Sequence, residues 1–146
     1  HLGLRGNYNF GPLHTGIISY VSGDVSGKSD GMLARIEINQ PIAAGERVII
    51  IPYIGAEYMS EKYSDYYFGI KESEAEKGIN KGESYKAGDT FNLEGGVRSI
   101  ITINRNFKGL VSAEYTRYGK DVSNSPLVKD RNIYTLGMGI SYSSTF

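Results

Sequence analysis

The sequence predicts an all-β protein, an antiparallel transmembrane β-barrel to which this chain contributes about seven C-terminal strands. Three observations lead to this fold class. The stretch 131–146 alternates large apolar with small hydroxylic residues, over more than the usual five or six residues of a strand. Six further stretches show period-two patterning, and the connections between them alternate between short and long. Because seven strands do not close an even-numbered barrel, we expect a barrel of 8, 10 or 12 strands in all.

The composition restricts the possible functions. A formal net charge of zero provides no basic surface for nucleic acid. The chain has no cysteine, which removes disulfides, thiolate metal sites and cysteine nucleophiles. There is no run of eighteen apolar residues and no signal peptide, and the opening HLGLRGNYNF already has the pattern of a strand. We therefore expect residues 1–146 to be the C-terminal part of a single barrel domain.

The expected strands can be followed along the chain by their alternation and by the turn residues between them. They span residues 2–10, 13–21, 32–40, 47–59, 91–103, 108–116 and 131–146. In the last strand one face is expected to contact lipid through Tyr134, Leu136, Met138, Ile140, Tyr142 and Phe146. A soluble, lipocalin-like barrel is the structural alternative, and it would point Leu136, Met138 and Ile140 inward instead.

The opposite face of the predicted strands carries charged side chains of both signs. These are Arg5, Arg35, Glu37, Glu57, Glu94, Arg98 and Glu114. In a narrow barrel they would pair across the lumen, because an isolated charge in a poorly hydrated interior is costly. A selectivity ring around a pore is the functional alternative. The mixture of signs at similar depth favours a structural network of charges in the lumen.

The connections assign a direction to the strands. Bacterial outer-membrane barrels have short periplasmic turns and longer external loops. The short connections here are FGP, PIAAGE and NRNF, and the long ones include an external loop over 60–90. Within that loop we expect one short surface helix at Lys71–Lys77, ended by Gly78. Aromatic residues at strand ends form two expected interfacial belts: Tyr58, Tyr115 and Tyr134 outside, and Phe10, Phe107, Tyr142 and Phe146 at the periplasmic side.

Three groups of residues resemble one protein family. The first is Tyr66–Ile70 (YYFGI), followed by Glu74-Ala75, a stretch from Tyr85 to Gly88 and a glycine-rich strand at Leu93–Gly96. The second is Asp121 with Ser125, Pro126, Leu127 and Val128, and the third is Gly137, Gly139, Ser141, Tyr142 and Phe146. In these the chain resembles the MipA/OmpV family, whose members are called MltA-interacting proteins. The resemblance implies an outer-membrane barrel without catalytic activity. Some members are described as scaffolds linking a lytic transglycosylase to a peptidoglycan synthase, and others as adhesins.

Catalytic and metal sites are not expected. The histidines are His1 and His14, and neither is placed for a Ser/His/acid set near the outer leaflet. Aspartates lie in or beside the expected external loops at Asp24, Asp30, Asp65, Asp89, Asp121 and Asp130, without an Asp-x-Asp-x-Asp calcium loop. We expect a non-enzymatic scaffold in the outer membrane of a Gram-negative bacterium, with no cofactor. Its expected partners are lipid and lipopolysaccharide, and on the periplasmic side a lytic transglycosylase and a peptidoglycan synthase. A small channel or a surface adhesin are the functional alternatives.

Overall fold

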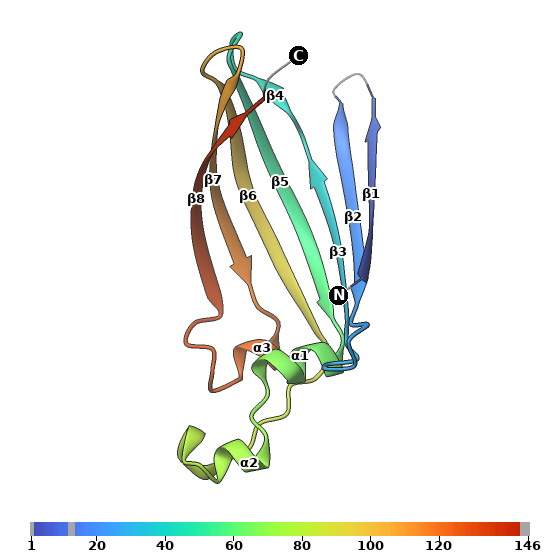
Figure 1. Cartoon of the computed structure of the whole chain (residues 1–146), viewed down its shortest axis with the longest axis vertical. Coiled ribbons are helices and arrows are strands. Elements are labelled where there is room, and N and C mark those ends of the chain that lie inside the picture. The colour runs from blue at the N-terminus through green and yellow to red at the C-terminus, as the bar shows by residue number, and fades with distance from the viewer. Residues whose placement is uncertain (1, 12–13, 144–146) are drawn as a thin grey trace.

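The chain forms one antiparallel sheet, which the computed structural model describes for residues 2–11 and 14–143 (Figure 1). Hydrogen-bonded neighbours follow the order β1-β2-β3-β5-β6-β7-β8, and β4 pairs only with β5. The strands are β1 (Leu2–Phe10), β2 (Thr15–Gly23), β3 (Met32–Asn39), β4 (Ile42–Ala43), β5 (Val48–Met59), β6 (Thr90–Thr102), β7 (Phe107–Arg117) and β8 (Asn132–Tyr142). Within the described residues β1 and β8 are the two edges, so the sheet is open.

Two details of the strand prediction were wrong. The second strand begins at Thr15 rather than at residue 13, because the turn continues through His14. That residue has a φ of 54°, and its backbone N–H donates to the Gly11 carbonyl at 3.2 Å. The expected turn PIAAGE also contains β4, whose two residues pair with Ile49 and Ile50 of β5. Two residues are too few for an alternation to be recognisable in the sequence.

The register gives the sheet two chemically different faces. Side chains of directly paired residues lie on the same face, and successive residues alternate between faces. Arg5 pairs with Tyr20, Tyr20 with Arg35 and Arg35 with Glu57, and these residues define the polar face. The other, apolar face carries Leu, Ile, Val, Met and aromatic side chains from all seven long strands.

The predicted lipid-facing residues of β8 lie on the apolar face. The exposed fractions of Tyr134, Leu136, Met138, Ile140 and Tyr142 run from 62% to 93%, and Phe146 lies outside the described residues. The accessible surface of the chain is 10210 Å², whereas a compact soluble protein of its 16.1 kDa exposes about 7,400 Å². The apolar face is therefore uncovered in the part of the chain that the structure describes. No helix among the described residues is both long and apolar enough to cross a membrane.

The connections segregate by length to opposite ends of the sheet (Figure 1). The short ones lie at the end that we call the turn end. The long ones lie at the other, which we call the loop end, with all the helices: α1 (Glu61–Phe68), α2 (Glu72–Ala75), the 3-10 helix η1 (Ile79–Gly82) and α3 (Lys120–Ser123). The helix expected at Lys71–Lys77 is present only as the four residues of α2. The expectation that the external loop held no further helix was wrong, as α1 is its longest element.

Aromatic side chains of the apolar face pair near both ends of the strands. Tyr58 packs on Phe91 with ring centroids 5.0 Å apart, and Tyr115 packs on Tyr134 at 5.2 Å, both towards the loop end. At the turn end the pairs are Phe107–Tyr142 at 5.0 Å and Tyr8–Phe10 at 6.2 Å. The two aromatic groups thus lie where the sequence places its two belts.

Candidate functional site: a charged network on the polar face

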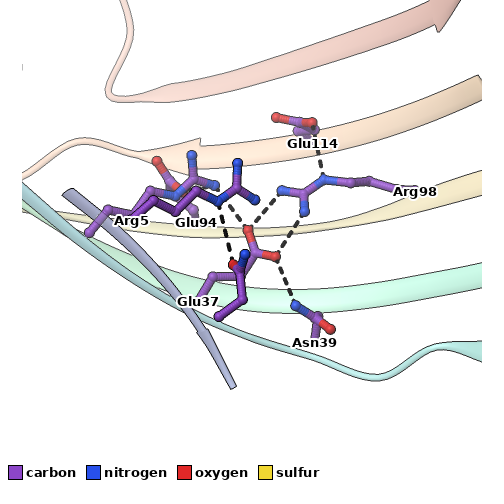
Figure 2. A network of polar contacts seen from close by, with 8 residues as sticks. Arg5, Glu37, Asn39, Glu94, Arg98 and Glu114 are labelled. Carbon is purple, nitrogen blue, oxygen red and sulfur yellow. Dashed lines mark hydrogen bonds and ion pairs between the residues drawn. The ribbon is translucent and has the colours of Figure 1, made fainter. Parts of the chain in front are cut away.

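Glu37 of β3 is the centre of the network (Figure 2). Its side chain is only 4% exposed, and its two carboxylate oxygens accept separate hydrogen bonds from Arg98 of β6, from Nη1 and Nη2, at 2.8 Å each. This two-point contact is the strongest geometry for an arginine and a carboxylate. Asn39 Nδ2 donates to Glu37 Oε1 at 3.3 Å. The carboxylate is therefore both buried and fully occupied.

Two further carboxylates extend the network. Arg35 of β3 lies 3.3 Å from Glu37 and 2.6 Å from Glu94 of β6, measured from Nη2 to Oε2 in both cases. The approach to Glu94 is an ion pair off the line of a good hydrogen bond. Arg98 Nε lies 3.9 Å from Glu114 Oε1 on β7, the loosest contact of the set. Two arginines thus compensate three glutamates, and the five residues come from β3, β6 and β7.

Glycines clear the space that these long side chains need. In the register, Gly55 of β5 lies between Glu37 and Glu94. Gly96 of β6 lies beside Tyr53, and a Cβ there would meet the tyrosine ring at 3.0 Å and the Ala113 carbonyl oxygen at 2.5 Å. Because Gly96 leaves this room, the buried Tyr53 ring lies flat enough for the Arg98 guanidinium to stack on it, 3.8 Å from the ring centroid.

Two of the seven predicted charges lie on the polar face without an ion pair among the described residues. Glu57 Oε1 accepts a hydrogen bond from Asn92 Nδ2 at 3.0 Å. Arg5 Nε makes a long contact of 3.4 Å with Asn7 Oδ1. Arg5 also lines a hollow of about 330 Å³ together with Ile18, Tyr20, Arg35, Glu37 and Arg98. The structure therefore joins five of the seven charges and leaves Arg5 and Glu57 at the margin.

Sequence reasoning missed the neutral partners of the network. Tyr53 supports Arg98, Asn39 caps Glu37, and the fully buried Asn92 holds Glu57. The period of two places Tyr53, Asn39 and Asn92 on the predicted inward face with the charged residues, which is a usable signal. It does not show the contact of Asn92 with the Gly119 N–H, which donates to its Oδ1 at 3.0 Å.

The aspartates at the loop end have structural roles. Asp24 accepts hydrogen bonds from Ser26 and Ser29, through hydroxyl and backbone groups of both, and these bonds hold its pKa well below the usual range for aspartate. Asp65 Oδ1 accepts from the Ala87 N–H at 3.0 Å, and Asp89 Oδ1 accepts from the Glu61 N–H at 2.5 Å. Within residues 2–11 and 14–143, no three acidic or histidine side chains converge as a metal site.

The model of the family described as MltA-interacting protein MipA matches residues 1–144. Outer membrane protein Omp26La of Vibrio anguillarum is 31% identical over 126 residues, which cover 86% of this chain and 48% of the relative. Outer membrane protein OmpV of Vibrio cholerae is 32% identical over 93 residues, or 64% and 35% of the two chains. YiaT of Escherichia coli is 28% identical over 120 residues, or 82% and 47%.

The chain spans about half the length or less of these curated relatives, and no solved structure matches it. The relatives are named as outer membrane proteins of Gram-negative bacteria, which confirms the localisation expected from the sequence. The family match covers nearly the whole chain, including the YYFGI segment at Tyr66–Ile70 and the strand β8. The chain therefore belongs to the MipA family, that of the MltA-interacting proteins.

Proposed function

We propose that the chain is a large part of an outer-membrane β-barrel that acts as a non-enzymatic scaffold for peptidoglycan-remodelling enzymes. The observation that supports a barrel is the chemical difference between the two faces of the sheet. Apolar side chains cover one face of every long strand, whereas the opposite face holds an ion-paired network. Such pairing suits a narrow lumen, because an unpaired charge in a poorly hydrated interior is costly. The open edges β1 and β8 leave room for the strands that would close the barrel.

The scaffold role is supported by the family description. A protein named for its interaction with MltA has a lytic transglycosylase as a partner, and a peptidoglycan synthase is the second enzyme of the proposed assembly. Both partners act in the periplasm, so the proposed docking surface is the turn end. The saturated contacts of Glu37 and Arg98 favour a rigid wall over an ion pathway, because a conducting lumen needs charges that are free to exchange partners with ions.

The embedding of β8 in lipid can be tested with tryptophan, because residues 1–146 contain none and any tryptophan elsewhere in the full-length protein can be replaced by phenylalanine. Leu136→Trp and Thr135→Trp place the probe on opposite faces at neighbouring positions of β8. The full-length protein is reconstituted in vesicles containing brominated lipid. We expect strong quenching of the probe at Leu136 and weak quenching at Thr135. Equal quenching at both positions would contradict the barrel.

The partner can be tested at the turn end. Arg47 and Arg105 lie in short connections there, and Lys129 lies in a long connection at the loop end. We expect the double variant Arg47→Glu/Arg105→Glu of the full-length protein to lose capture of an MltA-type lytic transglycosylase. The matched variant Lys129→Glu should retain it. Capture that is lost only in Lys129→Glu would reverse the orientation, and capture that survives both variants would exclude the turn end as the docking surface. A parent protein that captures no transglycosylase would contradict the scaffold. Conductance of the parent protein in planar bilayers would favour the channel instead.

A further inference from the structure

The long connections at the loop end are folded into a compact unit. We call this unit the cap, and it comprises residues 60–70, 85–89 and 118–131. The intervening residues 71–84, which we call the knob, carry α2 and η1 and project away from the strands (Figure 1). The knob joins the cap where Ile70 and Tyr85 pair as an antiparallel bridge, with N–H···O distances of 2.7 and 3.0 Å.

The two connections of the cap hold each other. The Ser125 hydroxyl donates to the Phe68 carbonyl at 2.5 Å, and the Tyr85 hydroxyl donates to the Asp121 carbonyl at 2.6 Å. Val122 of α3 is fully buried in this interface. The connection between β5 and β6 and the connection between β7 and β8 therefore form one body with its own small core.

The cap is also fastened to the ends of the strands. Met32 N–H donates to Ser60 Oγ and Ser60 N–H donates to the Met32 carbonyl, both at 2.9 Å. The first turn of α1 lies directly on Gly31, where a Cβ would come within 2.5 Å of the Tyr63 backbone nitrogen. Asp89 accepts from the Glu61 N–H and so caps α1 from the far end of the connection.

The cap covers the polar face and leaves the apolar face free. At the loop end the polar-face residues Met59, Thr90 and Asn92 are buried, whereas their neighbour Phe91 on the apolar face is 66% exposed. Burial, together with the nearby Tyr67 and Glu57, raises the pKa of the Tyr63 hydroxyl, which fits its position over the polar face. An external loop of flexible chain would not bury one face of a sheet selectively.

We infer that the cap is a closed lid over the external mouth of the lumen, so that the charged network is shielded from the cell surface. This inference rests on the proposed barrel. Asn92 connects the lid to the polar face, because it accepts from Gly119 of the cap and donates to Glu57 of the polar face. The contacts that close the lid lie within the protein.

The test uses the absence of cysteine from residues 1–146, and any cysteine elsewhere in the full-length protein is first replaced by serine. Single cysteines are introduced in the full-length protein at Ser112 on the polar face, at Leu136 on the apolar face and at Ser84 in the knob. Intact cells are treated with a membrane-impermeant maleimide. We expect rapid labelling of Ser84→Cys and none of Ser112→Cys or Leu136→Cys.

Opening the lid should expose the polar-face cysteine alone. Tyr85→Phe with Ser125→Ala removes both hydrogen bonds between the two connections, and we expect it to raise the labelling rate of Ser112→Cys by about tenfold or more. Val122→Asp, which buries a charge in the core of the cap, should do the same. Replacing the knob by Asn-Gly is the matched control, because a two-residue turn closes the Ile70–Tyr85 pair and should leave Ser112→Cys shielded.

The possible failures can be told apart. If Ser112→Cys in the parent is labelled as fast as Ser84→Cys, the inference of a closed lid is wrong, but the proposed barrel is not contradicted. If both cap variants keep their fold by circular dichroism and Ser112→Cys stays unlabelled, the cap is not what shields it, and the inference fails again. If Leu136→Cys is labelled from outside, the apolar face is not in lipid, and it is the proposed barrel that fails.

Discussion

Replacing Glu37 with glutamine keeps the size of the side chain but removes the negative charge that both Arg35 and Arg98 contact. Breaking a fully buried ion pair costs about 3–5 kcal/mol, much of it from the charge left without a partner. The Arg98 side chain is 33% exposed, so water can hydrate part of the freed guanidinium. We therefore expect Glu37→Gln to lower the free energy of unfolding by about 2–3 kcal/mol.

A double-mutant cycle isolates the pair. Arg98→Met removes the partner charge, and the double variant Glu37→Gln/Arg98→Met should be less destabilised than the sum of the two single variants, by a coupling of about 2 kcal/mol. The assay is urea unfolding of the full-length protein in vesicles, followed by far-ultraviolet circular dichroism. Raising the salt to about 1 M, where the Debye length is about 3 Å, should leave this coupling nearly unchanged because the pair is largely buried.

The exposed pair of Glu61 and Lys86 is the matched control. Lys86 Nζ lies 2.6 Å from Glu61 Oε1, closer than the contacts of Glu37 and Arg98, but the Lys86 side chain is 75% exposed and that of Glu61 is 50% exposed. Its coupling should be small and should vanish in high salt. A coupling for Glu37 and Arg98 below about 0.5 kcal/mol, or one that salt removes as it does in the control, would refute the argument that burial makes this network structural.

Three other predictions follow from the same geometry. Met138→Arg, on the apolar face in mid-strand, should lower the free energy of unfolding in lipid by about 2–4 kcal/mol, and Tyr142→Arg, near the strand end, should lower it by about 1 kcal/mol or less. Equal effects of the two variants on unfolding in vesicles would exclude a lipid contact that varies with depth. Gly96→Ala, whose Cβ would come within 2.5 Å of the Ala113 carbonyl oxygen, should cost about 1–3 kcal/mol in the same unfolding assay, and an unchanged midpoint would contradict it. Folding lowers the pKa of Asp24, so its carboxylate stabilises the folded state at pH values above the ordinary pKa of 3.8, and this contribution is lost as the pH falls through the lower folded pKa. A carbon-13 titration of Asp24 with a midpoint at or above pH 3.8 would refute this prediction.

The facing of the strands was predictable because a strand has a period of two. Once Glu37 and Met138 are assigned to opposite faces, the face of every other residue in their strands follows from the alternation. Pairing then brings Arg5, Tyr20 and Arg35 into one row without further information. This is why all seven predicted inward charges lie on one face, whether or not they form ion pairs.

The pairing of the charges was not predictable to the same degree. Glu37 and Arg98 are 61 residues apart, and their contact passes over β5 at Gly55 and Tyr53. It depends on the register of three strands, on the missing side chains at Gly55 and Gly96, and on the ring of Tyr53. A pattern of alternation contains none of these three conditions.

The helix α1 was also not predictable from the sequence. Its sequence EKYSDYYF has three tyrosines and no leucine or alanine, and Ser60 at its N-cap makes no side-chain capping bond. The bond to the first N–H comes instead from Asp89, 28 residues away. Its aromatic residues are therefore explained by the surface that α1 covers rather than by helix propensity. In this chain the strands follow from local alternation, whereas the cap follows from contacts that only the folded sheet brings together.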